Sequence, residues 1–171
     1  LFTEKIHLNK KTHNFTSFKK FLIKKRINYK VVKNINSEIN EIKKSLSSNS
    51  RNILLLVNCI WKISDEILNL FKNNVFNIHL GTLPSQVGAG GASWLRMIDA
   101  KKSSISIHQV NDQYDEGKML LFDDFYLKKD FSLDYYYSRV RKLERKTYRR
   151  FFDILIKNKL KFKKVTTKNF I

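Results

Sequence analysis

The amino-acid sequence predicts an α/β protein with an open, mostly parallel twisted sheet and flanking helices. Short apolar runs that are typical of strands alternate with segments whose apolar residues repeat at helical spacing. Residues 53–57 are continuously apolar, as expected for a parallel strand that is covered on both faces. Because ligands bind beyond the carboxyl ends of the strands in such sheets, we expect functional residues at strand ends.

The first fifty residues contain two predicted strands and two predicted helices. Residues 1–3 form the end of one strand, and residues 29–32 form a second, short strand. Between them, Asn14 is a potential cap for a helix in which Phe18 and Leu22 share a face.

The second predicted helix follows the short strand. Either Asn36 or Ser37 is expected to cap it, because short polar side chains accept hydrogen bonds from the first free backbone amides. Its apolar face consists of Ile39, Ile42 and Leu46, which recur at helical spacing.

The middle of the chain continues the alternation. A helix is expected to start at Ser64, where Asp65 and Glu66 lie at the positive end of the helix dipole. Residues 75–80 form the next apolar strand, and the glycine-rich residues 88–91 lead into a further helix.

The last third of the chain predicts two strands and one long helix. Residues 104–108 alternate like a strand, and residues 119–122 form another. Ser132 begins the helix. The apolar stripe of this helix consists of Val140, Leu143, Thr147, Phe151 and Leu155. We therefore expect one domain over residues 1–130 and a C-terminal helical extension over residues 131–171.

The composition favours an ordinary globular protein of the cytoplasm. The 171 residues, 42% of them hydrophobic, suffice for one domain with a proper core. No apolar run approaches the roughly 18 residues that cross a bilayer, and no signal-peptide pattern is present. The single cysteine, Cys59, excludes an intramolecular disulfide, and its apolar neighbours predict a buried, inert thiol. No Cys and His residues pair at zinc spacing, so we expect no metal.

The formal net charge of +19 raises the alternative of a basic α/β module that binds nucleic acid. The basic residues are mostly lysines and are dispersed along the chain. The densest basic cluster spans residues 139–150 and lies on the long final helix, where a solvated polar face is the usual explanation. We therefore expect a small-molecule substrate rather than a nucleic acid.

Asn77 and His79 are the first candidate catalytic residues. On a strand, positions i and i+2 point to the same side, so these two side chains project together. A neutral amide donor beside a titratable imidazole suits a developing oxyanion, and Asp115 in a later loop would complete the set. The alternatives are a core histidine bonded to backbone for His79 and an ordinary turn residue for Asp115. His108 lies within a strand, and we expect it to be structural.

Two short motifs resemble the signatures of the folate-dependent formyltransferases. The first is Asn77-Ile78-His79, followed by Leu83-Pro84 and the glycine-rich residues 88–91. The second is Asp115-Glu116-Gly117, which precedes an apolar strand. The family includes glycinamide ribonucleotide formyltransferase, methionyl-tRNA formyltransferase and the amino-sugar N-formyltransferases. The resemblance covers residues 1–127 and makes the predicted domain a formyltransferase catalytic domain.

The resemblance implies N10-formyltetrahydrofolate as co-substrate and two sets of binding residues. The expected cofactor-binding residues are Ile60, Trp61, Ile63, Ile67, Asn111 and Asp112. The expected substrate-binding residues are Gly81, Leu83, Pro84, Gly88 and Gly90. The alternatives are packing of helix on sheet for the apolar residues and a tight turn for the glycines.

The resemblance also implies a reaction, the transfer of a formyl group to a primary amine. We expect Asn77 to donate a hydrogen bond to the oxyanion. We expect Asp115 to hold His79 protonated and to help remove the amine proton. The chain departs from the better-known members at Leu80-Gly81 and at Gln86-Val87. These departures concern the substrate subclass and leave the chemistry intact.

The acceptor is expected to be an amino sugar carried on a nucleotide, with methionyl-tRNA as the alternative. Only about forty residues follow residue 127, which is too few for the added domain of the methionyl-tRNA enzymes. The family also opens with a strand, a glycine-rich turn and a helix that this sequence lacks. We therefore expect a fragment without its first strand and helix, and a homodimer is a possible use of the long helix.

Overall fold

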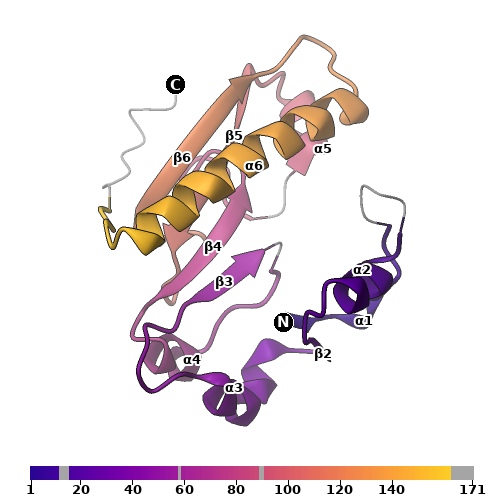
Figure 1. Cartoon of the computed structure of the whole chain (residues 1–171). Helices are drawn as coiled ribbons and strands as arrows, with labels where there is room; N and C mark the ends of the chain where they lie inside the picture. The colour runs from indigo at the N-terminus through magenta and orange to yellow at the C-terminus, as the bar shows by residue number, and fades with distance from the viewer. Residues whose placement is uncertain (12–15, 58, 89–90, 163–171) are drawn as a thin grey trace. The chain divides into compact units, whose positions relative to one another are not determined.

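A computed structural model describes residues 1–11, 16–57, 59–88 and 91–162 (Figure 1). The chain divides into two compact units, Leu1–Ser48 and Asn49–Ile171, and each is described by itself. Among the described residues, no helix combines the length and the apolar composition that crossing a bilayer requires.

The first unit is built on two short parallel strands. Strand β1 (Phe2–Thr3) pairs with β2 (Lys30–Val31), as the apolar pattern predicts. The helices of this unit are α1 (Lys5–Leu8), α2 (Phe18–Lys24), the 3-10 helix η1 (Ile35–Glu38) and α3 (Ile39–Ser45). The predicted face of α2 is present, with Leu22 buried, and α1 is a short helix that was not predicted from the sequence.

The helix caps of the first unit differ from those expected. The Ser17 side chain caps α2 by accepting a hydrogen bond from the Lys20 amide, while Asn14 lies outside the described residues. Asn34 caps the next helical segment, because its Oδ1 accepts from the amide of Asn36 at 2.9 Å. The expectation that Asn36 or Ser37 is the cap was wrong, since a 3-10 turn precedes α3 and moves the start two residues earlier.

The second unit contains a four-stranded sheet in the order β3-β4-β5-β6. Its strands are β3 (Leu54–Val57), β4 (Val75–Leu80), β5 (Lys102–Gln109) and β6 (Met119–Tyr126). Strands β3 and β4 are parallel, β5 pairs antiparallel with β4, and β6 pairs antiparallel with β5. The open α/β sheet with flanking helices is thus confirmed, and the pairing is mixed because β5 and β6 form a hairpin.

Three helices accompany this sheet, each close to its predicted position. They are α4 (Asp65–Leu70), α5 (Gly91–Met97) and the 24-residue α6 (Leu133–Ile156). Ser64 and Ser132 occupy the N-cap positions predicted for them, and Ser132 Oγ accepts from the Tyr135 amide at 3.1 Å. Figure 1 shows α6 running along the sheet, beside β5 and β6.

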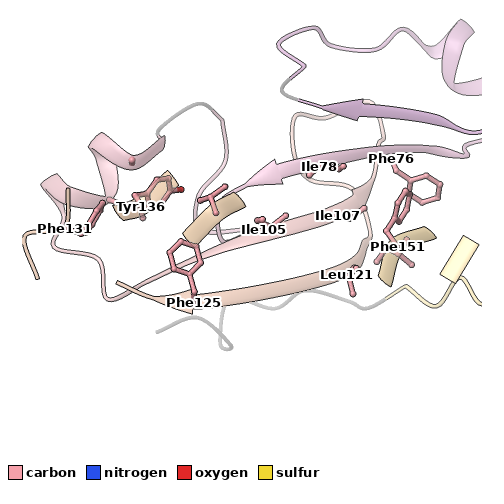
Figure 2. Packing of buried hydrophobic residues seen from close by; sticks show 13 residues of the cluster. Phe76, Ile78, Ile105, Ile107, Leu121, Phe125, Phe131, Tyr136 and Phe151 are labelled. Carbon is pink, nitrogen blue, oxygen red and sulfur yellow. The ribbon is translucent and has the colours of Figure 1, made fainter. Parts of the chain in front are cut away.

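The core of the second unit lies between the sheet and α6 (Figure 2). Phe76 of β4 meets Phe151 of α6 in an edge-to-face contact, with ring centroids 5.4 Å apart. Val140, Thr147 and Phe151 of the predicted stripe are buried. The stripe therefore packs against the sheet. The predicted boundary at residue 130, between the catalytic domain and the C-terminal helical extension, stays a prediction.

Candidate active site

The register of β4 against β5 brings the polar residues of two strands together. Asn77 and His79 lie on β4, and their partners on β5 are His108 and Ser106 respectively. Because side chains alternate along a strand, all four project from the same side of this pair. The backbone pairing of β4 with β5 thus places these four polar side chains together on one face of the sheet.

Asp115 joins this row from the loop between β5 and β6. Its Oδ1 accepts a hydrogen bond from Asn77 Nδ2 at 3.1 Å, and its Oδ2 accepts from the Gly88 amide at 3.0 Å. Oδ2 also lies 3.4 Å from His79 Nδ1, and Oδ1 lies 3.3 Å from His108 Nε2. The structure thus brings the three predicted catalytic side chains together.

Gly117 explains the spacing of the second motif. A Cβ atom at this position would lie 1.5 Å from the carbonyl oxygen of Gln109, so only glycine lets the chain pass this close to β5. Asp115 itself has a φ of +54°, a left-handed conformation that aspartate tolerates better than most residues. The turn therefore fixes the Asp115 backbone close to the two strands.

The environment of Asp115 keeps it ionised. Burial raises its pKa, but the hydrogen bonds from His108 and the Gly88 amide and the field of His79 outweigh burial and bring the pKa to about 2. The site therefore holds a fixed negative charge at any pH near neutrality.

For His79, burial is the larger of the opposing effects on the pKa. Burial lowers its pKa below the ordinary value and outweighs the opposing effects of Asp115 and of the Gln86 carbonyl. Its Nε2 lies 2.6 Å from that carbonyl oxygen, to which it donates its proton. The expectation that Asp115 holds His79 protonated was wrong, because the imidazole is only 8% exposed and loses more from lost hydration than it gains from the carboxylate.

The loop after β4 is fastened to β5 by hydroxyl groups. Ser106 Oγ donates to the carbonyl of Gly81 at 2.8 Å, and Ser104 Oγ lies 2.9 Å from Thr82 Oγ1. A Cβ atom on Gly81 would lie 2.7 Å from His79 Nε2, so glycine there allows the loop to close over the imidazole. These hydrogen bonds keep the loop, and with it the carbonyl of Gln86, next to His79.

A cavity of about 450 Å³ opens beside these polar residues. Asn77, His79, Asp115 and His108 form part of its wall. The predicted binding residues that line it are Ile60, Trp61, Ile63, Asn111 and Gly88. The cavity wall therefore combines apolar and aromatic side chains with the polar cluster, as small-molecule sites commonly do.

The other predicted binding residues lie elsewhere. Ile67 is fully buried in the core, and Asp112 is exposed and accepts a hydrogen bond from the Gln113 side chain. Gly81, Leu83 and Pro84 belong to the fastened loop and are absent from the cavity wall, and Gly90 lies outside the described residues. Ile67 differs from the prediction because the apolar pattern of a helix does not distinguish a core face from a cavity wall.

Several cavity residues were not expected to be functional. His108 is 1% exposed, yet it contacts both Asn77 and Asp115. Cys59 is half-buried and lines the cavity, whereas a buried, inert thiol was expected. Tyr114, next to Asp115, lines it too. An antiparallel pairing of the two motif strands would have revealed His108, since it is the direct neighbour of Asn77 in that register.

Two further properties bear on ligands. Among the described residues, no three His, Cys, Asp or Glu side chains are grouped to hold a metal ion. Asn77 Oδ1 is the one buried side-chain acceptor of the described part of the chain that has no hydrogen-bond partner. Because an unpaired buried acceptor is costly, this atom is open to a donor from a ligand.

Comparison with known proteins identifies the family. Residues 4–151 match the family model described as formyl transferase. The chain belongs to this family. A similar curated protein, the methionyl-tRNA formyltransferase of Finegoldia magna, is 30% identical over 129 residues, which are 72% of this chain and 41% of that protein. The chain thus spans under half the length of this relative.

Solved structures share the fold over almost the whole chain. The sugar 3N-formyl transferase WlaRD superposes with a TM-score of 0.75 at 19% identity, covering 99% of this chain and 57% of that one. An N-formyltransferase from Helicobacter canadensis gives 0.75 at 14% identity, covering 98% and 57%. These likenesses show that the α/β fold is that of formyltransferases.

Proposed function

We propose that the protein transfers a formyl group from N10-formyltetrahydrofolate to a primary amine. The observation that carries this proposal is the convergence of Asn77, His79 and Asp115 in the wall of a largely apolar cavity. Membership of the formyl transferase family supports it. When bound, the folate supplies the formyl carbon, and the chain contributes orientation and electrostatics.

The cavity fits a folate by its chemistry. Trp61 and the isoleucines of its wall suit a flat aromatic ring system, and Asn111 supplies a further polar group. The unpartnered Asn77 Oδ1 offers an acceptor to a ligand N–H. We infer that Ile60, Trp61 and Ile63 hold the cofactor, with the reacting carbon toward Asn77 and His79.

In the proposed reaction, the amine nitrogen forms a bond to the formyl carbon, and the bond from that carbon to folate N10 then breaks. Asn77 donates an N–H to the oxygen on which negative charge develops. His79 enters neutral, with its Nε2 proton on the Gln86 carbonyl, so its Nδ1 can accept the proton that the amine loses. The Asp115 carboxylate, 3.4 Å away, stabilises the resulting imidazolium, and N10 recovers a proton as it leaves.

For the acceptor, we propose an amino sugar carried on a nucleotide. Two proteins of the same fold support this choice, since one is a sugar 3N-formyl transferase and the other was crystallised with dTDP-3-aminofucose and folinic acid. The net charge of +19 suits the phosphates of such a substrate. Methionyl-tRNA remains the second candidate, because a relative with 30% identity carries that function.

One assay tests both the proposed reaction and the proposed acceptor. The purified protein receives N10-formyltetrahydrofolate labelled in the formyl group, together with either methionyl-tRNA or a panel of amino-sugar nucleotides. We expect label in the sugar amide and none in the tRNA. Label in the tRNA alone would show that the acceptor is methionyl-tRNA and not an amino-sugar nucleotide. Absence of folate binding, together with salt-dependent binding of RNA or DNA, would favour the non-catalytic nucleic-acid-binding alternative.

A further inference from the structure

His108 is a buried histidine of the cavity wall that the proposed reaction does not use. It lies on β5, opposite Asn77 in the antiparallel register, and it is 1% exposed. Its Nε2 is 3.3 Å from Asp115 Oδ1 and 3.2 Å from Asn77 Nδ2. Its Nδ1 is 3.2 Å from the carbonyl oxygen of Gln109. A neutral imidazole has one N–H, so the two ring nitrogens cannot both donate.

The orientation of the Asn77 amide is fixed by Asp115. An ionised carboxylate only accepts hydrogen bonds, so the amide nitrogen of Asn77, and not its oxygen, has to face Asp115. One N–H of Asn77 is therefore committed to Asp115 Oδ1. The fate of the second N–H depends on which nitrogen of His108 carries the proton.

The two tautomers of His108 have different consequences. With the proton on Nδ1, the bare Nε2 accepts the second N–H of Asn77 and turns a lone pair toward the Asp115 carboxylate. With the proton on Nε2, His108 donates to Asp115 Oδ1, turns the bare Nδ1 toward the Gln109 carbonyl and leaves the second N–H of Asn77 without an acceptor among the described residues. Because the two oxygens lie at similar distances from the ring nitrogens, 3.2 and 3.3 Å, the full charge of the carboxylate outweighs the dipole of the carbonyl and favours the second arrangement.

We propose that His108 is a positioning residue for formyl transfer: its Nε2–H donates to Asp115 Oδ1, which orients the carboxylate and frees one Asn77 N–H for the developing oxyanion. This inference rests on the function proposed above. Asp115 then accepts from His108 on Oδ1 and from the Gly88 amide on Oδ2, and the Nδ1 of neutral His79 lies 3.4 Å from Oδ2. His79 is the other titratable group that faces this carboxylate.

The first experiment reads the tautomer directly and requires no activity. Long-range ¹H–¹⁵N correlation spectra of the wild-type chain assign the proton on each histidine ring. We expect His108 to carry its proton on Nε2. A His108 ring with a protonated Nδ1 and a bare Nε2 would overturn the proposal, whether or not the protein transfers formyl groups.

The second experiment separates positioning from packing with two matched variants. His108→Gln keeps an N–H donor near the position of Nε2, whereas His108→Leu keeps the apolar bulk and removes the donor. We expect His108→Leu to lower kcat about 10- to 100-fold, the usual effect of misplacing a reacting group, with the KM for the folate within about twofold. His108→Gln should retain most of the activity.

A carboxyl titration of Asp115 by ¹³C NMR supplies a readout that a packing role would not move. The pKa of Asp115 should rise in His108→Leu, because a hydrogen bond to the ionised form is lost, and should stay low in His108→Gln. Equal losses in both variants, or an unchanged Asp115 titration in His108→Leu, would show that His108 only fills space. Total absence of formyl transfer would overturn the proposed function, and the spectra would still decide the role of His108.

Discussion

The second unit holds two aspartates in contrasting surroundings, Asp115 in the candidate site and Asp123 under α6. Asp123 lies on β6 and is 7% exposed. Its partners come from α6: Thr147 Oγ1 donates at 2.9 Å, Arg150 forms an ion pair, and Lys146 Nζ lies 3.4 Å away. The partners of Asp115 are two imidazoles, an amide side chain and a backbone N–H.

This difference separates a carboxylate that stabilises the fold from one that serves chemistry. Arginine and lysine stay charged at physiological pH, so Asp123 has permanent partners and joins the long helix to the sheet. A histidine side chain can accept and release a proton in catalysis, so His79 beside Asp115 can take part in proton transfer. Variants at the two positions should therefore affect different measurements, activity for Asp115 and stability for Asp123.

The largest effect on activity is expected for Asp115→Asn. Asparagine keeps the size of the side chain and tolerates the left-handed backbone, but it removes the charge that stabilises the His79 imidazolium. We expect kcat to fall by about 10³-fold or more, as in hydrolases whose histidine loses its carboxylate. Single-turnover kinetics measures this, with circular dichroism as the control for folding. A loss below about tenfold would remove Asp115 from the chemistry.

The next effect is expected for Asn77→Ala. Removing one oxyanion donor costs about 100-fold or more in kcat. The KM for the folate should change little, because Asn77 acts on charge that develops during the reaction. His79→Ala should lower kcat at least as much. Steady-state kinetics checks both variants, and near-normal turnover in either one would contradict its assigned role.

The pH dependence should follow His79. Because its folded pKa is lowered, the neutral form persists somewhat below pH 6.5, and activity should fall only as the pH drops through that lowered pKa. The free energy of unfolding should change with pH in the same direction as the activity. The unfolded chain binds the proton more readily, so His79 contributes full stability above pH 6.5, and this contribution is lost as pH falls through the folded pKa. A profile of kcat/KM with its acid limb above pH 6.5 would contradict the neutral base.

The smallest effect on activity is expected for Asp123→Asn, which tests the other side of the comparison. Losing this buried charge should lower the free energy of unfolding by about 1–3 kcal/mol, because Arg150 remains half-exposed and can recover water. Thr147→Val, which removes only one hydrogen bond, should cost about 1 kcal/mol. Urea denaturation measures both. Near-normal kcat in folded Asp123→Asn would support the contrast, and a loss like that of Asp115→Asn would break it.

The parts of the site that follow from strand periodicity could be predicted from the sequence. Asn77 and His79 share a side because they are two residues apart, and Asp115 was found through the second motif. His108 could not be recognised, because its contact with Asn77 depends on an antiparallel register that the apolar pattern does not reveal.

The charge of His79 could not be predicted either. Its sign depends on two opposing effects, burial and the neighbouring carboxylate, and only the folded structure gives their sizes. For the fold, too, some features could be predicted from the sequence and others could not. The position and type of the main elements were predictable, while the direction of β5 was not, since buried parallel and antiparallel strands are equally apolar.

The left-handed backbone of Asp115 also limits which substitutions can report on its chemistry. At a φ of +54°, a β-branched or bulky side chain collides with its own backbone. A saturation library at this position would therefore mix two kinds of inactive protein, those that lack the carboxylate and those whose turn has changed shape. Asparagine and glycine are the replacements whose backbones keep the turn, and comparing these two separates the contribution of the side chain from that of the loop.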